Sequence, residues 1–176
     1  MDTQPYYTKA RLKSLKEAAD DWVSATGIDW DIAACWHLPL SDIDGGVEQA
    51  ELHISRKLRL YFNKLDRRVF KAQHKKGFRV RRFITLEHAA SVGWHVHGIL
   101  ATPSHVDQRQ FITEVQQVWL HCAQHDKIGL PRTNLAWCEA IRDSYARYTT
   151  KNSFGATQFA RGAIDLHNTF FGEPLN

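Results

Sequence analysis

Residues 83–100, FITLEHAASVGWHVHGIL, hold two segments in which apolar and polar side chains alternate. Alternation with a period of two is typical of a strand that buries one of its faces. The link between the segments, residues 89–93, has five residues, which is short enough for an antiparallel hairpin. We therefore expect two adjacent antiparallel strands, at about residues 78–88 and 92–101.

The second of these strands carries two histidines on one face. Trp94 and Val96 are expected to point into the core, so that His95 and His97 share the opposite face. Two imidazoles a few ångströms apart on a rigid strand form a chelating pair for a metal ion. A structural or surface pair of histidines would have the same spacing and is the alternative.

The first strand adds a carboxylate to this face. Ile84 and Leu86 fit the core side, which leaves Glu87 on the side of the histidines. A hairpin centred near residue 91 places Glu87 opposite His95, and one centred near residue 92 places it opposite His97. Two histidines and one carboxylate leave positions open for water and a phosphate oxygen, which suits Mg²⁺ or Mn²⁺ as a Lewis acid. An exposed strand carboxylate without a metal is the alternative.

The rest of the chain predicts an α+β fold. Apolar residues recur at helical or strand spacing along most of the sequence. Helices are expected at residues 8–25, at 47–72, from a capping box at 104–107 to about 125, and at 143–151. The tail can be interpreted as a further helix at 156–166. Two further strands are expected, at 28–38 and 135–141. This order predicts a mainly antiparallel sheet of four or five strands flanked by helices.

The composition is that of an ordinary globular protein. The 176 residues fit a single domain, with 43% hydrophobic and 24% charged residues. No apolar run approaches the ~18 residues that span a bilayer, and no signal peptide is evident. The three cysteines are widely spaced and odd in number, which predicts reduced thiols. We expect a soluble, cytoplasmic protein without a membrane partner.

Positive charge is concentrated in one segment. Between Arg56 and Arg82 there are twelve Lys and Arg residues and one acid, Asp66. The segment carries +11, and because the whole chain carries +4, the remainder carries −7. Such a stripe, with interleaved aromatics, suits a nucleic acid, although a solvated helix face is the alternative. The candidate DNA contacts are Arg56, Lys57, Lys64, Arg67, Arg68, Lys71, Lys75, Lys76, Arg79 and Arg81.

A tyrosine-rich segment is the third chemical feature. On a helix over residues 143–151, Tyr148 and Lys151 are neighbours. A phenol is a weak nucleophile until a cation or a metal favours its anion, and Lys151 could serve as that cation or could bind the phosphate. Tyr145 lies three residues earlier and could be a second nucleophile or the true one. The alternative is an aromatic residue at the edge of the core beside a solvated lysine.

Together these motifs resemble the HUH endonuclease superfamily. Glu87, the His-Val-His at residues 95–97 and the Tyr-x-x-Lys at residues 148–151 occur in the order of rolling-circle replication initiators (Rep) of phages and plasmids. Among these initiators, the sequence resembles the filamentous-phage replication proteins. The resemblance covers about residues 28–151 of what we expect to be a single nuclease domain, residues 1–176.

The resemblance implies a reaction, a site and partners. His95, His97 and Glu87 would bind Mg²⁺ or Mn²⁺, and Tyr148 would attack single-stranded DNA to give a 5′-phosphotyrosine and a free 3′-hydroxyl. Lys151 would assist at the phosphate, and strand transfer would later release a circle. The expected partners are single-stranded DNA or an origin hairpin, with a host polymerase and a separate host helicase, because no Gly-x-x-x-x-Gly-Lys-Ser/Thr motif occurs.

Three alternatives remain open at this point. Relaxases, which transfer strands in a related way, place the tyrosine near the N-terminus, where Tyr6 and Tyr7 lie, but they use a third histidine that is not evident here. The protein could be such a relaxase- or transposase-type strand transferase. It could also be an origin DNA-binding module without catalysis, or a metal-dependent hydrolase in which Tyr148 is structural.

Overall fold

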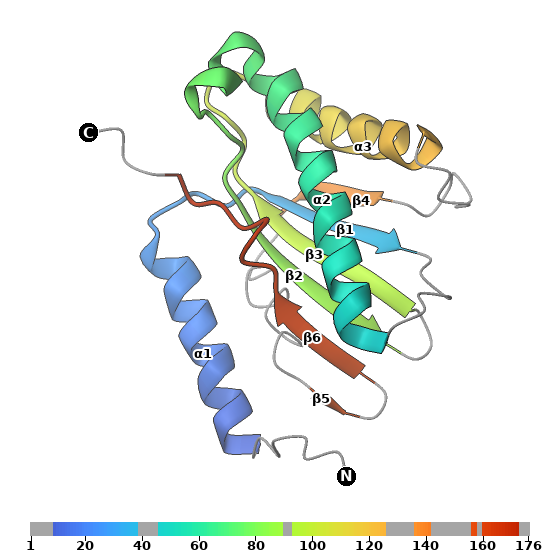
Figure 1. The fold of residues 1–176 in the computed structure, drawn as a ribbon. Coiled ribbons are helices and arrows are strands. Elements are labelled where there is room, and N and C mark those ends of the chain that lie inside the picture. The colour runs from blue at the N-terminus through green and yellow to red at the C-terminus, as the bar shows by residue number, and fades with distance from the viewer. Residues whose placement is uncertain are drawn as a thin grey trace.

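The computed structural model describes residues 9–38, 46–89, 93–125, 136–141, 156–157 and 160–172. Figure 1 shows a sheet with α2 and α3 lying across one of its faces. The helices and strands of the described residues are α1 Lys9–Ala25, β1 Ile32–Leu38, α2 Gly46–Phe70, the 3₁₀ helix η1 Lys71–Lys76, β2 Arg82–Ala89, β3 Gly93–Leu100, α3 Gln108–His125, β4 Ala136–Ala140, β5 Ala156–Thr157 and β6 Ala160–Ile164.

The sheet has the strand order β4-β1-β3-β2-β6-β5, and each pair of neighbours is antiparallel. The predicted α+β fold with an antiparallel sheet is therefore confirmed. The described residues form six strands where four or five were expected, because β5 and β6 extend the sheet beyond β2. The helix considered for residues 156–166 is wrong. Gly162 weakens a helix there, and pairing of Leu86 with Ala163 instead satisfies the backbone groups of β2.

The central hairpin adopts the first of the two registers considered. Ala89 lies opposite Gly93, Glu87 opposite His95 and Thr85 opposite His97, which centres the hairpin on residue 91. Residues 90–92, which connect the strands, lie outside the described part of the chain. Because successive side chains of a strand alternate between faces, this register places the carboxylate and both imidazoles on the same face of the sheet.

The opposite face of the hairpin forms the main core with α2 and α3. Ile84, Leu86, Trp94 and Val96 belong to this buried cluster, as predicted. The ring of Trp36, from β1, lies directly over Gly98 of β3, where an added Cβ would come within 2.7 Å of the ring. A glycine is therefore required beside His97 for this aromatic ring to pack against the sheet.

Strand β1 starts later than predicted, at Ile32 rather than at residue 28. The Asp31 carboxylate accepts hydrogen bonds from the Thr102 backbone N–H at 2.8 Å and from the Gln108 side chain at 2.9 Å. Trp30 consequently packs with Phe171 in the smaller cluster on the other face of the sheet, not with the main core.

Two helix boundaries differ from the predicted ones. Asp107, rather than Ser104, caps α3, because its carboxylate accepts hydrogen bonds from the N–H groups of Arg109 and Gln110 at 3.0 and 3.2 Å. Helix α2 ends at Phe70, where Lys71 has a φ of 49° and the chain continues as η1. None of the described helices combines the length and the apolar character that crossing a membrane requires.

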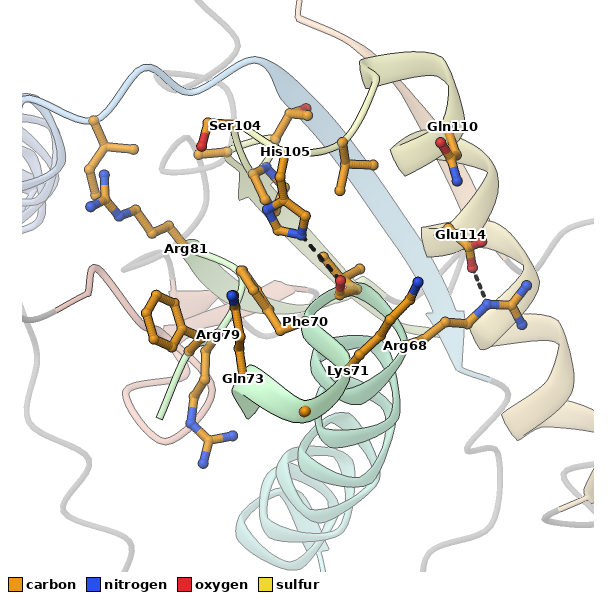
Figure 2. A pocket seen from close by; sticks show the side chains of 18 of the residues that line it. Arg68, Phe70, Lys71, Gln73, Arg79, Arg81, Ser104, His105, Gln110 and Glu114 are labelled. Carbon is orange, nitrogen blue, oxygen red and sulfur yellow. Dashed lines mark hydrogen bonds and ion pairs between the residues drawn. The ribbon is translucent and has the colours of Figure 1, made fainter. Parts of the chain in front are cut away.

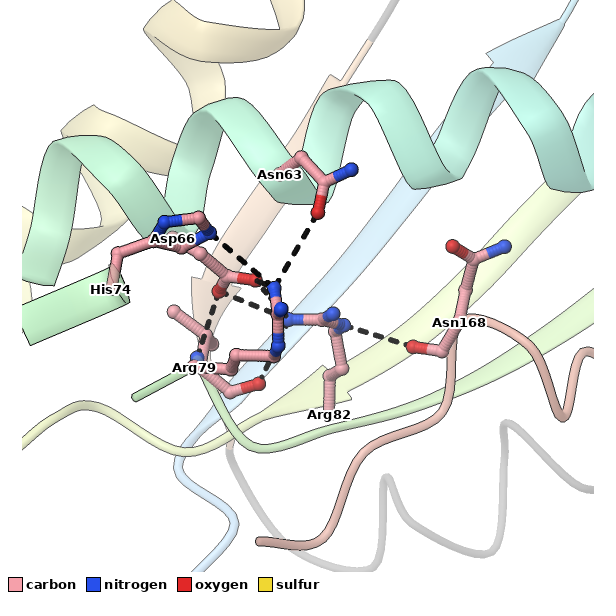
Figure 3. A network of polar contacts seen from close by, with 7 residues as sticks. Asn63, Asp66, His74, Arg79, Arg82 and Asn168 are labelled. Atoms are coloured by element: carbon pink, nitrogen blue, oxygen red, sulfur yellow. Dashed lines mark hydrogen bonds and ion pairs between the residues drawn. The ribbon is translucent and has the colours of Figure 1, made fainter. Parts of the chain in front are cut away.

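A buried ion pair ties α2 to the start of β2 (Figure 3). The Nη1 atom of Arg82 donates to both carboxylate oxygens of Asp66 at 3.1 Å, and Arg82 Nε donates to the Asn168 carbonyl at 2.9 Å. Asp66 is 0% and Arg82 6% exposed. The single acid of the basic segment thus neutralises one of its twelve cations inside the protein, where neither can contact a polyanion.

Candidate metal centre

Three side chains of the central hairpin converge on the face of the sheet that α2 and α3 do not cover. The Nε2 atoms of His95 and His97 lie 3.4 and 3.3 Å from the same carboxylate oxygen of Glu87. The two imidazole rings are 4.9 Å apart and nearly perpendicular, at 85°. One ligand atom from each residue lies within 4.8 Å of the others. The predicted grouping of these three residues is therefore present.

Two of the three distances among these atoms match those between ligands around one ion. Ligand atoms about 2.1 Å from a metal, at angles between octahedral and tetrahedral values, lie about 3.0–3.4 Å from one another. The two imidazole–carboxylate distances, 3.3 and 3.4 Å, fall at the upper end of this range. The donors are already arranged so that a divalent ion could sit between them, and three protein ligands leave further positions for water and a substrate oxygen.

The electrostatics of the site keep Glu87 ionised. Partial burial alone would raise the pKa of the Glu87 carboxyl, but hydrogen bonds from His95 and His97, together with their positive charge, outweigh it. The pKa of Glu87 is therefore held well below its usual range. Both histidines are 8% exposed, so the three groups interact in a medium where charge is weakly screened.

Strand β1 adds a third histidine to this face, which the sequence did not indicate. His37 lies opposite His95, and Cys35 lies opposite His97. The Sγ atom of Cys35 is 3.9 Å from Nε2 of His37. Burial, followed by the positive charges of His95 and His97, lowers the pKa of His37. The side chains of Cys35 and His37 therefore form one wall of the candidate metal centre.

Strand β4 places a tryptophan on the same face, two strands away from β3. Trp137 lies opposite Cys35, which in turn lies opposite His97. The side chain of Trp137 is 43% exposed. We call the face of the sheet that carries His95 and His97 the metal face. The aromatic ring of Trp137 extends this face toward the edge of the sheet. Sequence periodicity places Trp137 on a strand, but it does not show that this strand pairs with β1.

Helix α1 closes the far end of the same face. Val23 of α1 packs with Phe83 and Ile99, which lie further along β2 and β3 from the hairpin turn. Trp22 makes edge contacts with the rings of Phe83 and Phe171, at 6.0 and 4.7 Å. The candidate metal centre therefore lies between this apolar cluster and the turn of the hairpin.

The structure separates the predicted DNA contacts from the metal centre. The basic residues lie on α2, η1 and the segment before β2, and the sheet stands between α2 and the face that carries the histidines. Arg56, Arg67, Arg68, Lys71, Lys75, Lys76 and Arg81 are exposed, whereas Lys57, Lys64 and Arg79 are half-buried. Two of them make contacts within the protein: Arg68 forms an ion pair with Glu114, and Arg79 lies 3.5 Å from Asp66.

The tyrosine and lysine predicted to carry the chemistry cannot be placed against the metal centre. Tyr145, Tyr148 and Lys151 lie outside the described residues, and so do Tyr6 and Tyr7. Their roles remain predictions from the sequence and from its resemblance to a known superfamily.

Fold and site together define an α+β domain whose antiparallel sheet carries a two-histidine, one-carboxylate group able to hold a metal ion. No known family and no curated protein matches the sequence. Among solved structures, the chain is similar to the N-terminal nuclease domain of the non-structural protein 1 of minute virus of mice. The identity is 9% and the TM-score 0.35, over 90% of this chain and 79% of that one. That domain is described with Zn²⁺ coordination in its active-site pocket and with DNA recognition at the origin of replication.

Proposed function

We propose that this protein is a metal-dependent enzyme that nicks and rejoins single-stranded DNA, of the HUH endonuclease type. The observation that carries the proposal is the convergence of His95, His97 and Glu87 on one face of a two-stranded hairpin. Their order in the sequence, followed by a Tyr-x-x-Lys segment, is the second support. The domain would act in the initiation of rolling-circle replication, in the host cytoplasm and together with a host helicase and polymerase.

The three ligand residues would hold a divalent ion, Mg²⁺ or Mn²⁺. When bound, the ion supplies a Lewis acid that withdraws charge from a phosphate oxygen of the DNA. Two imidazoles in the donor set favour Mn²⁺ over Mg²⁺, since Mg²⁺ prefers oxygen ligands. The ionised state of Glu87 suits this role, because a carboxylate must be deprotonated to bind a metal.

Tyr148 would be the nucleophile of this reaction. Its hydroxyl oxygen forms a bond to the scissile phosphorus, and the bond from phosphorus to the 3′ oxygen breaks. The phenol loses a proton and the departing 3′ oxygen gains one, so that the products are a 5′-phosphotyrosine and a 3′-hydroxyl. Attack by a 3′-hydroxyl on the phosphotyrosine reverses these steps and rejoins the strand. Lys151 would stabilise the phenolate or the phosphate, and Tyr145 could act as a second nucleophile.

A non-catalytic DNA-binding module is the second candidate. The exposed cations of α2 and η1 lie across the sheet from the histidines, so DNA could bind them without reaching the metal centre. In that case His95, His97 and Glu87 would hold a structural ion or none, and no DNA would be cut.

The two candidates differ in whether a covalent product forms. A pool of single-stranded oligonucleotides labelled at the 3′ end is incubated with the protein and Mn²⁺, and the mixture is separated on a denaturing gel. A nicking enzyme with a 5′-phosphotyrosine retains the 3′ label on the protein, whereas a 5′ label is released on the shortened strand. Tyr148→Phe should abolish the adduct if Tyr148 is the nucleophile, and Tyr145→Phe shows whether the second phenol of the same segment contributes to it.

The outcomes separate the alternatives clearly. His97→Ala should abolish the adduct and leave a gel shift under native conditions, because phosphate contacts supply much of the affinity. Cleavage that survives in both tyrosine variants and in the double variant would point to a metal-dependent hydrolase that uses water. Binding without any cleavage by the wild-type protein, across metals and DNA pools, would leave the binding module as the better description.

A further inference from the structure

A hollow of about 900 Å³ lies at the end of the sheet remote from the candidate metal centre. The end of α2, η1, the segment before β2 and the loop between β3 and α3 form its walls (Figure 2). Arg81 lines the hollow and lies six residues before Glu87. In an extended strand this separation corresponds to about 20 Å. The hollow is therefore distinct from the site where a metal would bind.

The charged side chains of the hollow leave two cations available for a ligand. Arg68 forms an ion pair with Glu114, and Arg79 lies beside the buried Asp66. Lys71 and Arg81 are both exposed, and in the described part of the chain neither forms an ion pair with a carboxylate. One exposed acid, Asp29, also lines the hollow.

A second hollow, of about 640 Å³, adjoins the first and shares Lys71 and Arg79 with it. Its other lining residues are Arg67, His74 and Lys75, and none of the described residues that line it is an acid. The positive surface therefore continues past Lys71 to Arg67 and Lys75, so that several successive phosphates of a DNA strand could contact it.

Aromatic rings lie beside these cations. The ring of Phe70 is 6.1 Å from that of Phe78 and 5.2 Å from that of His105. His105 Nε2 donates a hydrogen bond to the Val69 carbonyl at 3.2 Å, which fixes this ring at the wall of the hollow. Phe78 is 36% exposed, so part of an apolar ring faces solvent next to positive charge. Aromatic faces beside cations are the combination with which proteins bind single-stranded nucleic acids.

The backbone has an unusual feature beside each of the two cations. Lys71 has a φ of 49°, which a residue with a side chain rarely adopts, at the point where α2 changes into η1. Arg81 lies over Gly172, where an added Cβ would come within 3.1 Å of the guanidinium Nε. A larger residue at position 172 would therefore displace the side chain of Arg81.

We infer that this hollow binds a segment of single-stranded DNA away from the cleavage site, with a base on the Phe70–Phe78 rings and phosphates at Lys71 and Arg81. The choice of DNA rests on the proposed function, but the binding needs neither the metal nor cleavage. The inferred site makes the protein hold its substrate at two places about 20 Å apart. It assigns a role to Lys71, where α2 ends on the face of the sheet opposite the metal centre, and to Arg81, which lies just before β2, at the end of that strand remote from the centre.

The test measures binding in EDTA, so that it is independent of nicking. Fluorescence anisotropy gives the Kd for a labelled oligothymidylate of about 12 nucleotides and for an abasic strand of equal length. Lys71→Gly removes the charge and is compatible with the positive φ, and Phe78→Ala removes an exposed ring. Arg59→Ala is the matched control, since Arg59 is an exposed cation of α2 that lines neither hollow.

The expected result is a rise in Kd of about five- to tenfold for each hollow variant and little change for the control. Lys71→Gly should also reduce the dependence of log Kd on log salt by about one phosphate contact, whereas Phe78→Ala should leave that slope unchanged. The abasic strand should bind the wild-type protein more weakly and be insensitive to Phe78→Ala. Ultraviolet cross-linking of oligothymidylate should label peptides that contain Phe70, Phe78 or His105.

Three results would overturn the inference. An equal loss of affinity in Arg59→Ala would mean diffuse attraction to a polyanion. Equal affinity for the abasic strand, with Phe78→Ala neutral, would mean that only phosphate is bound. Cross-links confined to peptides of β1, β3 or β4 would mean that the DNA lies on the metal face alone.

Discussion

His37 lies opposite His95 in the β1–β3 pair, and their imidazole rings are stacked with centroids 6.0 Å apart and an angle of 26° between them. His37 thus lies against His95, a predicted metal ligand. It does not belong to the group of Glu87, His95 and His97, whose side chains could hold one ion. We expect a ring in this position to orient its neighbour and to limit the access of water to it.

We predict that His37→Ala weakens metal binding without abolishing it. Loss of the stacked ring lets His95 turn, and changes next to a ligand typically cost about 10- to 100-fold in affinity. Titration of the apoprotein with Mn²⁺, followed by electron paramagnetic resonance, measures the Kd directly. His53→Ala, an exposed histidine of α2, is the control. If the two variants bind Mn²⁺ equally well, His37 has no part in the site.

We also predict that Mn²⁺ affinity falls as the pH is lowered. Both imidazoles must be neutral to bind a metal, whereas the pKa of Glu87 is held well below its usual range and its carboxylate stays charged. The folded-state pKa of Glu87 is depressed, so protonation of this group contributes only at strongly acidic pH. Affinity measured from about pH 8 to about pH 5 should therefore decline, because protons compete with a metal ion for imidazole nitrogens. A pH-independent affinity would contradict binding by the histidines.

The sequence predicted the hairpin and its metal face because both depend on local order. Alternation along residues 83–100 determines which side chains share a face, and a five-residue link allows only nearby registers. The placement of Glu87 beside one of the two histidines followed from these two facts, and the structure selects His95. His37 and Trp137 were missed because their positions depend on which strands pair with β3 and β1, and such long-range pairing leaves no local signal.

The basic segment shows a second limit of the sequence. Twelve cations in 27 residues predicted a polyanion surface, but the pattern does not distinguish a buried cation from an exposed one. Arg81 and Arg82 are adjacent, yet Arg81 is exposed and Arg82 is buried against Asp66. The difference arises from strand alternation at the start of β2, where the two side chains point to opposite sides.

This adjacent pair gives a prediction on stability. Arg82→Met leaves the Asp66 carboxylate buried without its main partner, which should lower the free energy of unfolding by about 3–5 kcal/mol. Arg81→Met, one residue earlier, should change it by less than about 0.5 kcal/mol. Urea unfolding followed by circular dichroism measures both. Restoration of much of the stability in Arg82→Met combined with Asp66→Asn would identify the lone buried charge as the cause, and equal effects of the two single variants would refute the assignment.

The buried cysteines give the last prediction, on alkaline stability. Burial, with a smaller contribution from the charge of Glu87, raises the pKa of Cys35 to about 12, and burial likewise raises that of Cys138 to about 12. In the unfolded chain a thiol ionises at its ordinary pKa, near ~8.5. Above that pH, ionisation therefore stabilises the unfolded state but not the folded state. Stability should therefore fall progressively as the pH rises from about 9 toward 12, and Cys35→Ala combined with Cys138→Ala should lessen that fall.

Native protein at about pH 8 should react with a thiol reagent at Cys35 and Cys138 only as fast as the folded structure opens, whereas protein in urea should react at once. Rapid modification of both thiols in the folded protein would contradict the burial of Cys35 beside the histidines and of Cys138 in the main core.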